Sequence, residues 1–179
     1  MVKKVLMPIA NGFEEIEAVT IIDILRRAGL QVEIAGCGRY EVLGAHGIAI
    51  GAEMTIEDVN ADEYDALVLA GGHENAIALS SDQAVQSVIV GLKQRGKLLA
   101  AICAAPIALA QAGAIEGSFT CYSGYEGGIE GDYKNERVVE SGNLITSQGP
   151  GTAAEFAFAI VSKMCGAEMA AQVKRAMYF

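Results

Sequence analysis

A single cysteine, Cys103, stands between an apolar run at residues 97–102 and a helix that opens near Pro106. The run predicts a buried strand, and the helix is expected over residues 104–112. A turn from strand to helix directs backbone N–H groups and the positive end of the helix toward the side chain. Such surroundings lower the pKa of a thiol, so Cys103 is a candidate nucleophile. The alternative is a buried structural thiol, because cysteine is among the most buried residue types.

Three carboxylates follow the first predicted strand, which covers residues 3–9. Glu14 and Glu17 are three positions apart and share a helix face, whereas Glu15 points elsewhere. Carboxylates near a helix N-terminus complement the helix dipole, which accounts for Glu14 and Glu15. Glu17 stands in an apolar stretch, and burial there would raise its pKa and suit it to general acid–base catalysis.

A glycine pair and a histidine follow a third apolar strand at residues 66–70. Gly71-Gly72 allows a tight turn whose N–H groups could form an oxyanion hole, although glycine pairs also end strands routinely. His73 could carry protons, and the alternative is a solvated loop histidine. No glycine pattern of a phosphate-binding loop follows any predicted strand.

The elements that must position these residues alternate between strand and helix. Asn11 and Glu14 resemble a capping box, with Asn11 as the N-cap. The other expected elements are a helix at 17–27, a strand at 31–35, a hairpin at 39–52, a helix at 82–94, short strands at 137–139 and 144–146, and a helix at 152–164. Strands that are apolar throughout predict a parallel sheet covered on both faces. In such α/β sandwiches ligands bind at the carboxyl ends of the strands, where all three candidate segments converge.

The length, composition and net charge of the chain limit the possible classes of function. The 179 residues are 52% hydrophobic, which predicts one domain over residues 1–179. A net charge of −9 disfavours nucleic acid as a partner. No apolar run is long enough to span a membrane and the start does not resemble a signal peptide, so a cytoplasmic protein is expected. The four dispersed cysteines predict reduced thiols, and with only two histidines we expect no metal site.

Four motifs together resemble the ThiJ/PfpI superfamily, and within it the branch of the parkinsonism-associated deglycase and its bacterial ThiJ-type relatives. They are NGFEEIEAV at 11–19, VLAGGHENA at 68–76, AAICAAP at 100–106 and TSQGPGTAAEFAFAIV at 146–161. The resemblance implies a flavodoxin-like three-layer sandwich, with a mostly parallel central sheet and helices on both faces. It also implies a homodimer without metal or organic cofactor that acts on small aldehydes such as methylglyoxal or on glycated adducts.

The resemblance also implies the roles of individual residues. Cys103 matches the nucleophile, and Glu17 matches a protonated glutamate that hydrogen-bonds the sulfur and acts as general acid and base. Gly72 and Ala104 match the backbone N–H donors of the oxyanion pocket. The dimer interface is expected to include part of the first helix and the region near His46.

The sequence departs from the family at two positions. Tyr122 stands where close relatives carry a histidine, and a tyrosine is no base at neutral pH. Proton transfer then depends on Glu17 or on His73, and Tyr122 forms a wall of the site. Ala104 stands where the protease branch has a histidine, which disfavours peptidase activity. Three functions stay open: a glyoxalase III or deglycase, a redox sensor or chaperone that uses Cys103 oxidation, and a relative without turnover.

Overall fold

The computed structural model describes residues 2–179 and is built around a seven-stranded sheet. Neighbouring strands in the sheet are parallel, except that β10 runs antiparallel to β11. From one edge to the other the order is β10 (Val138–Ser141), β11 (Leu144–Ser147), β7 (Leu98–Ile102), β6 (Ala66–Leu69), β1 (Lys4–Ile9), β2 (Gln31–Gly36) and β5 (Met54–Thr55). The expected parallel sheet is therefore confirmed.

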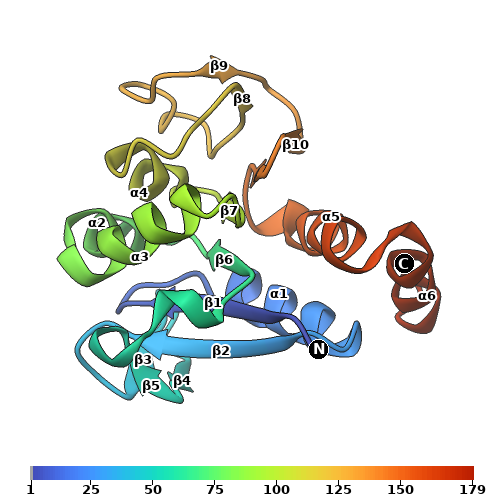
Figure 1. Ribbon diagram of the computed structural model, residues 1–179, viewed down its shortest axis with the longest axis horizontal. Coiled ribbons are helices and arrows are strands. Elements are labelled where there is room, and N and C mark those ends of the chain that lie inside the picture. The colour runs from blue at the N-terminus through green and yellow to red at the C-terminus, as the bar shows by residue number, and fades with distance from the viewer. Residues whose placement is uncertain (1) are drawn as a thin grey trace.

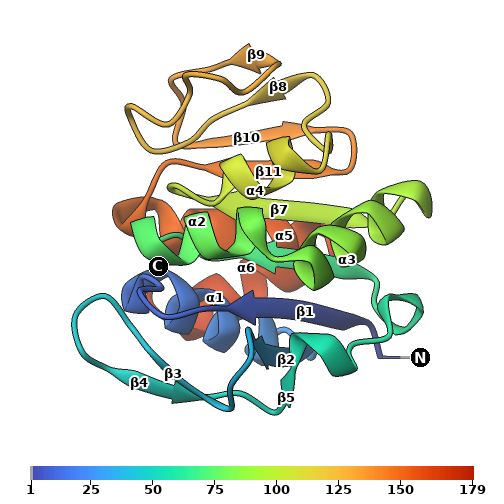
Figure 2. The same ribbon diagram turned by 90° about the vertical axis from the view of Figure 1, so that its left-hand side faces the viewer.

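Helices cover both faces of this sheet (Figures 1 and 2). One face carries α1 (Glu15–Arg27) and α5 (Ala153–Cys165), with α6 (Ala167–Ala176) packed on α5. The other face carries α2 (His73–Ser81), α3 (Gln83–Gln94) and α4 (Pro106–Gln111). This arrangement confirms the three-layer, flavodoxin-like sandwich.

Alternating side chains of β1 explain why its sequence is apolar throughout. Val5 and Met7 belong to the core under α1 and α5, whereas Leu6 belongs to the core under the opposite helices. Each strand residue therefore enters one of two separate cores, as in parallel sheets that are buried on both faces.

Two small sheets lie outside the central one. β3 (Glu41–Leu43) and β4 (Ala49–Gly51) pair antiparallel and confirm the hairpin expected at 39–52. β8 (Ser118–Phe119) and β9 (Asp132–Tyr133) were not expected, and they lie near β10 at the top of Figure 2. Short 3-10 turns occur at Ile56–Asp58, Ala61–Glu63 and Pro150–Thr152.

Two helices were not predicted from the sequence. α2 begins at His73, so this residue does not lie in a loop, and α6 follows Gly166. Asp82 separates α2 from α3, because its carboxylate accepts hydrogen bonds from Ala84 N at 2.8 Å and Val85 N at 3.0 Å. An N-cap of this kind starts a new helix without an intervening loop.

The expected capping box at the start of α1 is wrong. Glu14 occupies the N-cap position without a side-chain hydrogen bond, and Asn11 Oδ1 accepts a hydrogen bond from Leu43 N at 3.1 Å instead. Asn11 therefore ties the loop after β1 to the hairpin. Within residues 2–179, no helix combines the length and apolar character needed to cross a membrane.

Candidate functional site

Three neighbouring parallel strands, β1, β6 and β7, end at the same edge of the sheet, and the segments after them are hydrogen-bonded together. Glu14 N donates to Gly71 O at 3.1 Å, and Gly71 N donates to Glu17 Oε2 at 2.7 Å. The structure therefore brings the first helix and the glycine turn to the position where Cys103 follows β7.

Cys103 has a backbone conformation that is unusual for a residue with a side chain. Its φ is +63°, and within residues 2–179 Tyr178 is the only other non-glycine residue with a positive φ. Left-handed backbone strains a residue that has a Cβ, and such strain concentrates at functional sites. The half-buried cysteine therefore stands at a sharp turn, with α4 starting only at Pro106.

The glycine pair after β6 is required by close packing around the cysteine. A Cβ at Gly71 would lie 2.5 Å from Cys103 Cβ and 2.7 Å from Glu17 Oε2. Gly72 has a φ of +92°, and a Cβ there would lie 2.0 Å from Gly12 O. A side chain at either position would displace the cysteine, the glutamate or the loop after β1.

Glu17 is fully buried on α1, with an exposed fraction of 0%. One carboxylate oxygen, Oε2, accepts the Gly71 hydrogen bond, while Oε1 has no hydrogen-bond partner among the residues described. Burial raises the pKa of Glu17 to about 7, although the Gly71 N–H and contact with Cys103 oppose the increase. Glu17 is thus poised to hold or release a proton near neutral pH.

The pKa of Cys103 differs from the sequence-based expectation. Burial and the negative charge of Glu17 raise the pKa of the thiol to about 12, and hydrogen bonds from the N–H groups of Gly72 and Ala104 lower it only in part. The helix expected at residue 104 starts two residues later, so its N-terminus does not offset burial. Protonation of Glu17 removes the opposing charge, so the thiolate forms when the shared proton lies on Glu17.

The structure places the other predicted residues around this pair. The N–H groups of Gly72 and Ala104 lower the pKa of the Cys103 sulfur, as the donors of an oxyanion pocket would. Tyr122 N donates to Cys103 O at 2.8 Å, and the Tyr122 ring is half exposed. Their catalytic roles stay predictions.

His73 contacts a tyrosine that the sequence analysis missed. Its Nδ1 lies 2.5 Å from the hydroxyl of Tyr125. The two residues are 52 positions apart, so no local pattern connects them. Tyr122 and His73 also line separate surface hollows of about 360 and 370 Å³.

Asn75 is a second residue that the sequence analysis missed, and it joins two of the converging strands. It is fully buried on α2. Its Oδ1 accepts a hydrogen bond from Ala10 N at 2.7 Å, and its Nδ2 donates to Ala70 O at 2.8 Å and Gly71 O at 3.1 Å. The Gly-His-Glu-Asn order gave no signal of this role, because asparagine is normally exposed.

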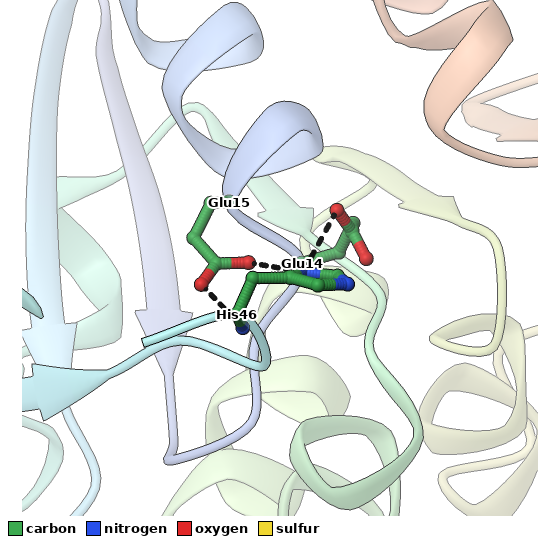
Figure 3. A group of neighbouring side chains, drawn as sticks. All are labelled: Glu14, Glu15 and His46. Atoms are coloured by element: carbon green, nitrogen blue, oxygen red, sulfur yellow. Dashed lines mark hydrogen bonds and ion pairs between the residues drawn. The ribbon is translucent and has the colours of Figure 1, made fainter. Parts of the chain in front are cut away.

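Glu14, Glu15 and His46 form a titratable cluster beside the site (Figure 3). Glu15 is buried and accepts hydrogen bonds from His46 N at 2.6 Å and Ile48 N at 3.3 Å, and its Oε2 lies 2.9 Å from His46 Nδ1. Burial alone would raise the pKa of Glu15, but these hydrogen bonds lower it to about 2. Glu15 thus anchors the hairpin through the loop at His46.

The ligand atoms of this cluster lie within 4.8 Å of one another, a spacing that could hold a metal ion. However, Glu15 is already engaged by N–H donors, and the helix N-terminus beside it favours anions over cations. The arrangement is better explained by anchoring of the hairpin.

Comparison with known proteins agrees with this geometry. The sequence model of the DJ-1/PfpI family matches residues 3–163, which is most of the chain. The chain belongs to the DJ-1/PfpI family. It is 41% identical to Parkinson disease protein 7 homolog of Danio rerio, over 96% of this chain and 95% of the relative.

Two further members of the family bear on fold and activity. The crystal structure of Drosophila melanogaster DJ-1beta superimposes with a TM-score of 0.95 at 35% identity, and the match covers 99% of this chain and 98% of that one. A Caenorhabditis elegans relative named glutathione-independent glyoxalase DJR-1.2 is 36% identical over 87% of this chain and 84% of its own length. The resemblance seen in the four motifs is therefore confirmed at the level of family and fold.

Proposed function

We propose that this protein is a cysteine-dependent glyoxalase III or deglycase that needs no cofactor. Its substrates would be 2-oxoaldehydes such as methylglyoxal, or the adducts they form, and it would act against carbonyl and oxidative stress. The observation that carries the proposal is the buried Glu17, with a pKa raised to about 7, next to the sulfur of Cys103. The relative named a glyoxalase supports the same reaction class.

The first step uses the proton that the two side chains share. With the proton on Glu17, the Cys103 thiolate adds to the aldehyde carbon, C1, and forms a carbon–sulfur bond. Glu17 gives its proton to the resulting oxyanion, and the N–H groups of Gly72 and Ala104 stabilise the negative charge while it exists. The product is a neutral hemithioacetal, and Glu17 is left as a carboxylate.

The second step is an isomerisation. The Glu17 carboxylate takes the hydrogen of C1 as a proton and returns it to the neighbouring carbon, C2, while the proton of the C1 hydroxyl passes to the C2 oxygen. C1 is thus oxidised while C2 is reduced by the same two electrons. A thioester of Cys103 results. Water then cleaves this thioester, releasing a 2-hydroxy acid and the thiol. Because the electrons stay within the substrate, the reaction consumes no oxidant or reductant.

Lactate formation from methylglyoxal tests the proposal. The wild type should form lactate and Cys103→Ala should not, because it has no nucleophile. Cys37→Ala is a matched control, since Cys37 is also half-buried and burial also raises its pKa to about 12. Loss of activity in both variants would indicate a general effect of removing a thiol. Equal lactate formation by the wild type and Cys103→Ala would contradict the proposal.

A second candidate function is a redox sensor or stress-protective chaperone that uses oxidation of Cys103 without robust turnover. The two N–H donors at the sulfur favour it, because they would also stabilise a sulfinate. A sensor of this kind would change its partner binding after peroxide treatment and would produce no lactate. The lactate assay therefore separates the two functions.

The proposal also includes the wider setting expected from the sequence. We place the protein in the cytoplasm as a homodimer of one-domain chains, without nucleic acid, membrane, metal or organic cofactor as a partner. The single sheet that collects strands from residues 4 to 147 supports one domain.

A further inference from the structure

A tyrosine–histidine pair connects two elements that both contact Cys103. Tyr125 lies in the segment between β8 and β9, and His73 is the first residue of α2. The His73 Nδ1 atom is 2.5 Å from the Tyr125 hydroxyl, and the two rings meet edge to face with centroids 6.1 Å apart. A contact this short between a phenol and an imidazole is a route for a proton.

Both ends of this connection are next to residues that contact Cys103. Gly71 packs against Cys103, and the N–H of Gly72, directly before His73, lowers the pKa of the Cys103 thiol. Tyr122, whose N–H donates to Cys103 O, packs its ring against Tyr125 with centroids 6.3 Å apart. Tyr125 is therefore held between Tyr122, which touches Cys103, and His73, which directly follows Gly72. Burial, followed by the negative charge of Cys103, raises the pKa of Tyr125.

The chemistry needs a proton carrier besides Glu17. When Glu17 takes the hydrogen from C1, negative charge develops on the oxygen of C2, and a second group must protonate it. Tyr122 has no described side-chain hydrogen bond to an imidazole, whereas Tyr125 does. The exposed ring of His73 can exchange protons with solvent, and the half-buried phenol of Tyr125 can present one to the site.

We propose that Tyr125 and His73 form a second proton carrier of the site. This inference rests on the proposed glyoxalase function and names the residues that serve the substrate oxygens. As Glu17 removes the C1 hydrogen, the Tyr125 hydroxyl donates its proton to the C2 oxygen, and an enediol forms. Glu17 then protonates C2, and the Tyr125 phenolate takes the proton from the C1 hydroxyl. Both groups return to their starting states, and the His73 imidazole hydrogen-bonds the phenol oxygen and stabilises the phenolate while it exists.

Methylglyoxal turnover by Tyr125→Phe and His73→Ala tests this inference. For Tyr125→Phe we expect kcat to fall by about 10²-fold, the usual contribution of a general acid, with KM changed by less than about 3-fold. The rate at which iodoacetamide alkylates Cys103 should stay at the wild-type value, because the nucleophile is untouched. Tyr133→Phe is the matched control, since that half-buried ring packs on Phe119.

Rescue with free imidazole distinguishes a chemical role of His73 from a structural one. His73→Ala should lose activity and regain it when imidazole is added, because the ring position is exposed. Imidazole should not restore Tyr125→Phe. A kcat near the wild-type value in Tyr125→Phe would overturn the proposed role of the Tyr125–His73 pair. A His73→Ala variant that is fully active, or that imidazole does not rescue, would do the same. Either result would leave the glyoxalase function intact. A wild type without turnover would overturn both. If Tyr125→Phe does not fold, the imidazole result decides.

Discussion

At the scale of single residues, the site depends on one proton shared by an acid and a thiol. Glu17 is buried and next to Cys103, so the two groups do not ionise independently. Moving the proton to Glu17 creates the thiolate nucleophile. After the thiolate has added to the aldehyde and Glu17 has given up its proton, the Glu17 carboxylate is the base for the next step. A single glutamate can thus serve as acid and base in turn.

Replacing Glu17 by Gln should separate activity from folding. The amide keeps an oxygen for the Gly71 N–H but cannot exchange a proton, so we expect lactate formation to fall by at least about 10²-fold. Circular dichroism should be unchanged. Full lactate formation by Glu17→Gln would remove this residue from the mechanism.

The same substitution should change the pH dependence of stability. The folded-state pKa of Glu17 is raised above the ordinary value of 4.5 to about 7, so the native protein binds more protons than the unfolded chain between these values. Stability should therefore fall as pH rises from about 4.5 to about 7, by about 1–3 kcal/mol for this group. Urea unfolding at several pH values should show a smaller decrease for Glu17→Gln. The exposed Glu57→Gln serves as control.

Peroxide should oxidise Cys103 before the other thiols. Cys121 is fully buried, and Cys37 is half-buried like Cys103 but has no backbone N–H group that lowers its pKa. Cys165 is exposed, but Cys103 has two N–H donors for a developing anion. Mass spectrometry of peptides after mild peroxide treatment should find sulfinate first at Cys103. Earlier oxidation of Cys165 would contradict this.

Peptide bonds should not be cleaved. Hydrolysis of an amide requires protonation of a leaving amine, which is normally the work of a histidine in contact with the nucleophile. The family resemblance places such a histidine at the positions of Ala104 or Tyr122, and the His73 ring is hydrogen-bonded to Tyr125. Incubation with casein should release no fragments. Cleavage by the wild type that is absent in Cys103→Ala would overturn this assignment.

At the scale of elements, the site depends on how the ends of β1 and β6 are held together. Asn75 on α2 satisfies one N–H after β1 and two carbonyl groups after β6. Asn75→Ala would leave these buried groups without partners, at a cost of about 2–4 kcal/mol in the free energy of unfolding. Urea unfolding measures this, and Asn143→Ala, an exposed asparagine with one bond to Gly96 O, is the control. Equal stability of the two variants would contradict the role of Asn75.

The sequence was sufficient to predict the alternating elements and the edge of the sheet where the site lies. Apolar strands and helical spacing are local signals, and they placed Cys103, Glu17 and Gly72 together. Local signals failed at α2, because Gly71-Gly72-His73 looked like a loop and Asp82 joins two helices directly. They also failed at Tyr125 and Asn75, whose partners lie 52 and 65 positions away. The raised pKa of Cys103 depends on burial that only the packed structure defines.

At the scale of the whole molecule, apolar side chains remain exposed around the start of α1 and the hairpin. Ile16 is 59% exposed, Val19 49% and Ile48 58%. Glu15 fixes the hairpin against the start of α1, so the segments that carry these exposed side chains are adjacent. An exposed apolar face of this kind is typical of an interface, which agrees with the expected homodimer.

Light scattering tests the dimer. We expect a mass of twice the 18.7 kDa of the chain at micromolar concentration. Ile48→Glu should shift the protein toward the monomer, because a charge would be buried in the interface. Ile77→Glu, on α2, is a control with a similar exposed fraction of 47%. A wild-type monomer would contradict the prediction.

The left-handed backbone of Cys103 also bears on how such a protein can evolve. Glycine adopts a φ of +63° without strain, so replacing Cys103 by Gly should raise stability by about 1 kcal/mol while it removes the nucleophile. A lineage released from selection for the chemistry would thus gain stability by drifting to glycine at this position. A relative that keeps cysteine at this position, although glycine would be more stable, is therefore one in which the thiol still has a function.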